Sequence, residues 1–474
     1  MKIVEVCEEI LSRIIPSDKE SKETHLFYKK LKDKMTSALQ SANIKADVNV
    51  QGSIAKDTWL SGEKDIDIFI SLPRRSPKIT FQKVLDVVKS IANEDWIASH
   101  AEHPYIEAKL EGYKIDFVPC FKIKSAKYAG SSVDRTPLHT AYIKKHLNLR
   151  MKSEVRLLKK FMQGIGAYGA EIKIKGFSGY LCELLVLRYG SFLNALRAIA
   201  SWRCGQIVDL ENFYLLQFME VKRKFSEPLI VIDPVDADRN VAAAVSKEKF
   251  GEVIMASRLF LDKPDIAFFF PEEVKPYSMK SLKENMENLG FDLVFIIFKC
   301  KETVPDIIWG ELYKTTQAIK RNMSKNGFQV FRDTAWSDEI ELCVLIFGLE
   351  NSKISSARKH VGPPVDSSEA IRFIEKYTEK SIENRLVVGP WIDKGRWIVL
   401  VKREYTEIEA MLLDSLRNKA RNMGIARNLV ESIRKAEVYV NENIREFYSN
   451  KTDFAKFLTN FLQGKPKWMK FNQE

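Results

Sequence analysis

Three aspartates have a spacing that could gather them into one acidic cluster. Asp65 and Asp67 lie two apart in DIDIFI, residues 65–70. A β-strand turns alternate side chains to the same face, so both carboxylates would point the same way. Asp116 lies in a second β-branched and aromatic run, residues 114–118, which we expect to pair beside the first strand. Three such carboxylates repel by several kcal/mol at an effective dielectric of about 20, which favours protonation or a bound cation.

A D-x-D pair by itself is usually a solvated face, and a neighbouring glycine makes this one more informative. Gly52 and Ser53 end twelve residues before Asp65, where they predict a tight turn opening a short helix. The free N–H groups and positive dipole end of such a helix suit a phosphate. Mg²⁺ binds carboxylate oxygens together with substrate phosphates. The pattern indicates a nucleotidyl-transfer site, with Asp65, Asp67 and Asp116 as candidate catalytic residues and Mg²⁺ ligands.

The arrangement resembles the signature of polymerase-β-like nucleotidyltransferases. More narrowly, GSIAKDTWLSGEKDIDIF (52–69) resembles the motif of the archaeal class (class I) of CCA-adding enzymes, the tRNA nucleotidyltransferases that build the 3′-terminal CCA. The resemblance continues in GFSGYLCELL (176–185) and DPVDADRNVAAAVS (233–246), and is weaker beyond. The chain departs from the family where Asp65 replaces the Glu of some members and Lys56 replaces a common Arg. Lysine keeps the charge but loses bidentate geometry on phosphate.

The resemblance also implies a set of nucleotide contacts. From the residues alone, His139 would be a linker histidine, Lys159 a solvated lysine, Tyr168 a packing aromatic and Arg239 an exposed residue in the first turn of a helix. The family pattern instead assigns them to phosphates, triphosphate, ribose and base in that order. The full predicted nucleotide-binding set is Gly52, Ser53, Lys56, Thr136, His139, Lys159, Tyr168 and Arg239.

Composition agrees with a polyanionic partner. The 474 residues carry 75 Lys and Arg against 63 Asp and Glu, a formal charge of +12, which favours nucleic acid. The resemblance makes tRNA the partner and CTP and ATP the substrates. The cytosine and adenine bases both present an exocyclic amine beside a ring-nitrogen acceptor. One arginine donor together with a backbone acceptor could therefore bind either base.

Other features bound the class of protein. The six cysteines are far apart, without a C-x-x-C pattern, and predict reduced, buried thiols. Acids interrupt the N-terminal apolar pattern and no apolar run reaches about 18 residues, which predicts a soluble, cytoplasmic protein that binds no membrane. Whether the protein is a homodimer is left open.

The predicted fold class is α+β and multidomain. A polymerase-β-like mixed-sheet catalytic domain is expected over residues 1–150 and a mostly helical central domain, completing the nucleotide site, over 151–265. An α+β RNA-binding body is expected over 266–330 and 400–474, with a tRNA-binding tail over 331–399.

Several local expectations accompany this division. Two N-terminal helices should pack behind the sheet, and a hairpin should turn at Glu111-Gly112. Residues 135–139, R-T-P-L-H, read as a linker, and KHVGPPV (359–365) as a turn-rich break whose His360 is structural or phosphate-contacting. The final KPKWMK (465–470) suits an RNA backbone, although a solvated helix face is nearly as consistent.

Three functions are compatible with these patterns. The first is CCA addition. The second keeps the chemistry but makes poly(A) or oligoadenylate from ATP alone. The third is a non-catalytic RNA-binding protein on the same scaffold. The intact aspartates disfavour the third, and the blocks at 176–185 and 233–246 favour the first over the second.

Overall fold

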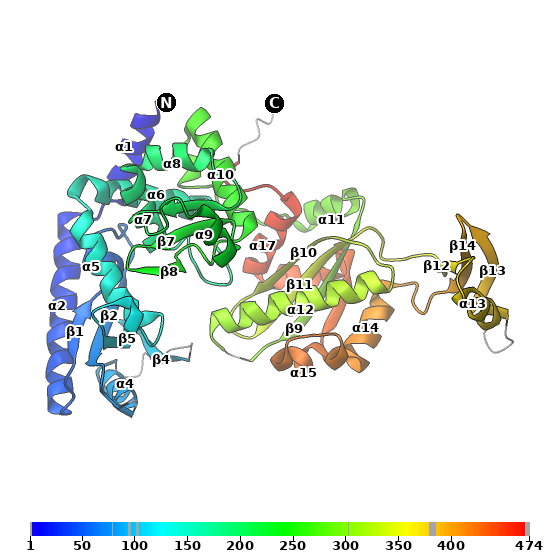
Figure 1. Ribbon diagram of the computed structural model, residues 1–474, viewed down its shortest axis with the longest axis horizontal. Helices are drawn as coiled ribbons and strands as arrows, with labels where there is room; N and C mark the ends of the chain where they lie inside the picture. Colours follow the sequence, from blue (N-terminus) through cyan, green and yellow to red (C-terminus); the bar gives the residue numbers. More distant parts are fainter. Residues whose placement is uncertain are drawn as a thin grey trace. The chain divides into compact units, whose positions relative to one another are not determined.

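Figure 1 shows a computed structural model of the chain, which describes residues 2–77, 79–92, 96–100, 104–301, 303–378 and 385–469, with the backbone alone for 97–100. The chain divides into two compact units. The first runs to Glu273 and includes the residues from Pro466 on, and the second is Val274–Lys465. Helices and strands are mixed in both units, which confirms the predicted α+β class.

A five-stranded sheet with the order β1-β2-β5-β4-β3 begins the first unit. Its central strands, β2 and β5, are parallel and the other pairs are antiparallel. The strands are β1 (Asp47–Val50), β2 (Asp65–Pro73), β3 (Trp96–His100), β4 (Pro104–Leu110) and β5 (Tyr113–Lys122).

Apolar side chains alternate with polar ones along the first part of β2, and they determine which face of the sheet packs against helices. Ile66, Ile68 and Ile70 are buried against α2 (Asp18–Ser41) and α4 (Ile79–Ala92), so the aspartates point to the opposite face. The predicted hairpin is confirmed, because β4 and β5 join at Glu111 and Gly112, whose φ angles of 50° and 79° form a left-handed turn.

The second core of this unit is mainly helical. Its helices are α1 (Ile3–Ile14), α5 (Thr136–His146), α6 (Leu149–Gly164), α7 (Gly179–Tyr189), α8 (Phe192–Ala200) and α10 (Lys247–Asp262). Helix α9 (Phe218–Lys224) packs in a smaller apolar cluster of the same unit. A three-stranded sheet, β6-β7-β8, joins them, with β6 (Gln206–Asp209), β7 (Leu229–Asp233) and β8 (Asp236–Asn240).

Four local expectations in this unit are wrong. Helix α1 packs on α6 rather than behind the five-stranded sheet, because its buried stripe joins the helical core. R-T-P-L-H opens helix α5 instead of a linker, since Pro137 fits the first helical turn. Arg239 lies on β8, not at a helix start. Trp468 is 3% exposed and stacks on Phe268 at 5.3 Å between ring centroids, so it is unavailable to RNA.

The second unit is built on an antiparallel sheet, β10-β11-β9-β15, with helices on both faces. Along β9, Val294 and Ile296 face α12, α14 and α15, while Leu293 and Phe295 face α11, α16 and α17. The sequence pattern also predicts strands at residues 293–298 and 341–347 and a helix around 308–320, and the structure confirms all three. The elements are β9 (Asp292–Lys299), β10 (Val330–Ser337), β11 (Leu342–Leu349), β15 (Glu437–Val440), α11 (Met279–Asn288), α12 (Pro305–Lys325), α14 (Ile408–Asn418), α15 (Val430–Ile433), α16 (Arg445–Asn450) and α17 (Thr452–Gln463).

A separate small sheet, β12-β14-β13, carries α13 (Glu369–Thr378). Its strands are β12 (Ala357–Pro364), β13 (Leu386–Asp393) and β14 (Arg396–Lys402). KHVGPP is thus a strand and not a break. Its prolines are tolerated because β12 is an edge strand with an irregular register between Val361 and Pro364. Strands β10 and β11 pair within the larger sheet, so residues 331–349 do not join this module, contrary to the predicted tail boundary.

Two global expectations have different outcomes. The six cysteines, all within the described ranges, are free thiols, and five are buried as predicted, but Cys204 is exposed. Within the described ranges, no helix combines the length and apolar character needed to cross a membrane.

Candidate active site

The parallel register of β2 and β5 sets Asp67 directly opposite Asp116, with Asp65 two residues earlier on the same face of β2. Burial and the neighbouring Asp67 raise the pKa of Asp116 to about 7. Burial also raises the pKa of Asp67, while Lys56 opposes that rise. Two carboxylates on neighbouring strands therefore resist ionising together.

The acidic pair has unused coordination capacity. Oδ1 of Asp116 is buried and finds no hydrogen-bond partner among the described residues. Buried polar atoms are normally satisfied, and oxygen atoms of this kind are ligands for hard divalent cations. Over the described ranges, no three acidic, His or Cys side chains are already gathered as a metal cage. The donor set fits a cation that also takes ligands from a substrate.

Gly52 lies against this pair. It opens α3 (Gly52–Lys56) with φ of +65°, and a Cβ there would lie 1.8 Å from Oδ2 of Asp67. The backbone N–H of Gln51 donates to the carbonyl of Asp67 at 2.9 Å. The structure thus brings the predicted Gly52-Ser53 turn together with the acidic pair.

Lys56 and Lys159 converge on an acid that the sequence patterns did not identify. Glu183 on α7 is fully buried and receives hydrogen bonds from Lys56 at 2.6 Å and from the Thr58 hydroxyl at 2.7 Å. Lys159 lies 3.4 Å from the same carboxylate and donates to the Thr58 carbonyl at 3.1 Å. Both lysines are buried rather than solvated.

Tyr168 lies near Lys159, as the predicted set requires. A Cβ at Gly179, the first residue of α7, would lie 2.8 Å from the Tyr168 hydroxyl and 3.5 Å from Nζ of Lys159. Burial raises the pKa of Tyr168 well above its ordinary value, so the hydroxyl stays protonated. Thr136 is half-buried at the start of α5, which packs against α3.

A second buried acid organises the remaining predicted contacts. Asp233, at the end of β7, bonds His139 Nε2 at 2.9 Å and Arg239 Nη1 at 2.7 Å through Oδ2. Its Oδ1 accepts from the Tyr180 hydroxyl at 3.2 Å. Burial alone would raise the pKa of Asp233, but the bond from His139 and the charge of Arg239 hold it below its ordinary value.

A cavity of about 720 Å³ opens beside Arg239. Its lining includes Arg135, Ser178 and Asp236, and Arg135 bonds Asp236 at 2.8 Å. This volume lies within the range of small-molecule sites.

Sequence patterns missed Glu183 and Asp233 as parts of the site. For Glu183 a signal was available, because it is the single acid inside the apolar run GYLCELLVL. Such an acid is seldom buried without a partner. Asp233 follows the wholly apolar strand segment LIVI, and the sequence there, Asp233-Pro234-Val235-Asp236, predicts only a turn.

We expect the metal-free protein to lose stability relative to its Asp116→Asn variant as the pH rises. A carboxyl whose folded pKa is about 7 binds its proton more tightly than the unfolded chain, whose value is about 3.9. Its stabilising contribution is full below about pH 4 and disappears as the pH rises through about 7. Thermal unfolding in EDTA at a series of pH values measures the difference in Tm, and a difference that stays constant with pH would contradict the assignment.

Comparison with known proteins covers most of the chain. Residues 29–139 match the family described as "Nucleotidyltransferase domain". Residues 153–270 match "tRNA nucleotidyltransferase, second domain", and residues 290–460 match "CCA-adding enzyme, C-terminal domain". The CCA-adding enzyme of Pyrobaculum islandicum is 37% identical over 411 residues, covering 86% of this chain and 92% of its own. That of Methanosarcina mazei is 35% identical over 460 residues, covering 96% and 97%.

A solved structure of the Cid1 poly(U) polymerase is 19% identical and covers 55% of this chain and 94% of its own, with a TM-score of 0.43. The two curated relatives carry the assignment, since each aligns over nearly its entire length at more than a third of positions. The chain therefore belongs to the archaeal-type family of CCA-adding enzymes and is a CCA tRNA nucleotidyltransferase.

Proposed function

We propose that this enzyme adds or repairs the 3′-terminal CCA of tRNA without a template, using CTP and ATP. The tRNA 3′-hydroxyl attacks the α-phosphate of the nucleotide, and pyrophosphate leaves. The observation that carries this proposal is the placement of Asp67 and Asp116 side by side against the Gly52 turn. A phosphate-binding turn beside an under-coordinated acidic pair is what nucleotidyl transfer requires.

Asp65, Asp67 and Asp116 would hold two Mg²⁺ ions. When bound there, the ions would lower the pKa of the attacking hydroxyl and neutralise charge on the leaving group. The N–H groups at Gly52 and Ser53, with the ammonium groups of Lys56 and Lys159, orient the triphosphate. These fixed positive groups stabilise charge that develops during transfer.

The nucleotide base would enter the cavity beside Arg239. Asp233 fixes this guanidinium from one side, so its remaining donors have a defined direction. His139, held by the same carboxylate and stacked on Tyr180 at 4.2 Å between ring centroids, would contact the phosphates, with Thr136 nearby on the same helix. Tyr168 would contact the ribose.

For tRNA, the small three-stranded module offers a basic cavity of about 720 Å³. Burial and nearby cations lower the pKa of His360, so the cavity's charge comes from lysine and arginine. These cations suit RNA phosphates and read no sequence. The charged lining residues are Arg358, Lys376, Arg385, Lys402, Arg403 and Glu404.

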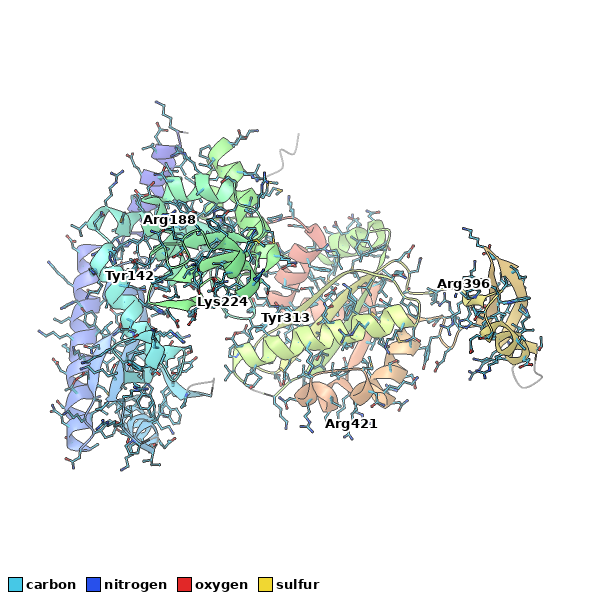
Figure 2. The ribbon with its side chains drawn as sticks, in the orientation of Figure 1. Tyr142, Arg188, Lys224, Tyr313, Arg396 and Arg421 are labelled. Atoms are coloured by element: carbon cyan, nitrogen blue, oxygen red, sulfur yellow. The ribbon has the colours of Figure 1, made fainter. Side chains whose placement is uncertain are left out.

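Incubating tRNA that lacks its 3′ end with each labelled nucleotide tests the function. We expect C, C and A to be added in that order and UTP and GTP to be excluded. Arg239→Ala should lower discrimination against UTP by about 10- to 100-fold, because one base contact contributes about 1–3 kcal/mol. Arg188→Ala on the exposed face of α7, labelled in Figure 2, is the matched control and should retain selectivity. Long runs of A on any RNA would favour the poly(A) alternative instead.

A further inference from the structure

We propose that Glu183 is a positioning residue for the nucleotide triphosphate: it places the Lys56 and Lys159 ammonium groups before the nucleotide arrives. The inference rests on the proposed function, in which both lysines contact phosphates. Neither the apolar pattern around Glu183 nor the family resemblance gave this side chain a role.

The carboxylate joins two parts of the site that are distant in sequence. Glu183 lies on α7, Lys56 ends α3, and Lys159 comes from α6. Its two oxygens contact Lys56 at 2.6 Å, and Thr58 at 2.7 Å together with Lys159 at 3.4 Å. All three charged side chains are at most 8% exposed. Contacts buried to this extent are costly to leave unmade.

The segment that follows α3 is also bonded to α6. Asp57 has φ of +55° and accepts bonds from Arg156 at 2.6 Å and Lys152 at 3.0 Å. Arg156 also donates to the carbonyl of Trp59 at 2.9 Å. The turn that begins at Gly52 is therefore held by α6 and α7 through Glu183 on one side and Arg156 on the other.

The charge balance at this point suits a polyanion. Two ammonium groups contact one carboxylate, so these three side chains together carry one excess positive charge. A buried lysine without a counter-ion tends to lose its proton, whereas a paired lysine keeps it. Glu183 thus allows a second buried cation to exist while leaving that excess for the triphosphate.

Electrostatic directions agree with this geometry. Burial lowers the pKa of Lys159, the charge of Glu183 raises it, and Lys56 lowers it further. Weaker effects come from Cys182 and Glu63, which raise it, and Lys159 in turn lowers the pKa of Asp67. Burial alone would raise the pKa of Glu183, but the two lysines hold it below its ordinary value. Removing the carboxylate should therefore let Lys159 become neutral as the pH rises.

The test compares Glu183→Gln with Glu154→Gln, an isosteric change on α6 whose carboxylate accepts a hydrogen bond from the backbone N–H of Phe192 at 2.8 Å. We expect Glu183→Gln to raise the KM for CTP by at least about tenfold, which corresponds to a loss of about 1.4 kcal/mol of binding free energy. The effect on kcat should be smaller. The increase in KM should grow between pH 6 and pH 9, while the parent and Glu154→Gln show no such growth.

Inorganic tripolyphosphate supplies a readout that does not need transfer to tRNA. Its dissociation constant, measured by calorimetry, should weaken in Glu183→Gln by a factor similar to that for CTP. Failure of the parent enzyme to add CMP to tRNA would overturn the proposed function. Tripolyphosphate binding would still test whether Glu183 positions the two lysines, because it does not depend on transfer. A folded Glu183→Gln variant with unchanged tripolyphosphate affinity and an unchanged pH profile would overturn the inference.

If Glu183→Gln does not fold, the buried excess charge can be reduced with Lys159→Met. The double variant compared with Lys159→Met alone measures the remaining contacts of Glu183, with Lys56 and with Thr58. A KM for CTP at least about five times higher in the folded double variant supports the inference. Equal KM values would mean that Glu183 serves the fold alone.

Discussion

Asp116→Asn will reduce the rate of nucleotide addition by about 1,000-fold or more while leaving the fold intact. Asp116 is paired with Asp67 across parallel strands and has an unpartnered buried oxygen within the described structure. Loss of one metal ligand removes several kcal/mol of transition-state stabilisation, and about 4 kcal/mol corresponds to about 1,000-fold. The amide is nearly isosteric and relieves repulsion with Asp67, so unfolding temperature should not fall. Single-turnover addition to tRNA measures the effect.

Asp67→Asn should behave in the same way, since it is the other member of the pair. Asp86→Asn, on the exposed face of α4 in the same unit, changes the same chemical group away from the site and should keep full activity. Addition by Asp116→Asn within tenfold of the parent would show that the acidic pair is not the catalytic centre.

Gly52→Ala will cost at least about 100-fold in nucleotide addition and will also destabilise the protein. A left-handed conformation costs a residue with a Cβ about 1–2 kcal/mol. At Gly52 the Cβ also enters the space of the Asp67 carboxylate, 1.8 Å from Oδ2, so either α3 or the carboxylate must move. Displacing a reacting group by about 1 Å is enough for a 100-fold loss.

Gly62→Ala separates the two causes. Gly62 has φ of +84° and therefore similar backbone strain, but no atom from elsewhere in the described part of the chain lies within 4 Å of the position of an added Cβ. It should lower the unfolding temperature while nucleotide addition stays near that of the parent. Equal losses of activity in the two variants would mean that strain in the segment, rather than contact with Asp67, explains the defect.

Local patterns predicted the elements that carry the acidic pair. Period-two alternation located β2 and β5 and gave the common face of Asp65 and Asp67, because strand geometry depends only on neighbouring residues. The hairpin at Glu111-Gly112 followed from turn chemistry for the same reason. Helix α12 and the strands beside it followed from long, regular apolar repeats.

Predictions were wrong where packing overrides local preference. The prolines of KHVGPP indicated a break, but an edge strand tolerates a residue that donates no hydrogen bond. Trp468 lies in a basic stretch, which indicated contact with RNA. Its ring is instead buried against Phe268, because burying a large apolar surface stabilises the fold. Helix α1 could cover either core on its own pattern, and only the positions of those cores decide the choice.

The sequence by itself determined which groups are available for chemistry: a D-x-D pair on one strand face, a third aspartate on a similar strand, and a glycine turn before them. The tertiary structure alone decided how the charges are balanced. Glu183 meets Lys56 across 127 positions of sequence, and Asp233 meets His139 across 94. A carboxylate's pKa and its partner depend on burial and on distances of a few ångströms in space, and these arise only when separate helices and strands pack together.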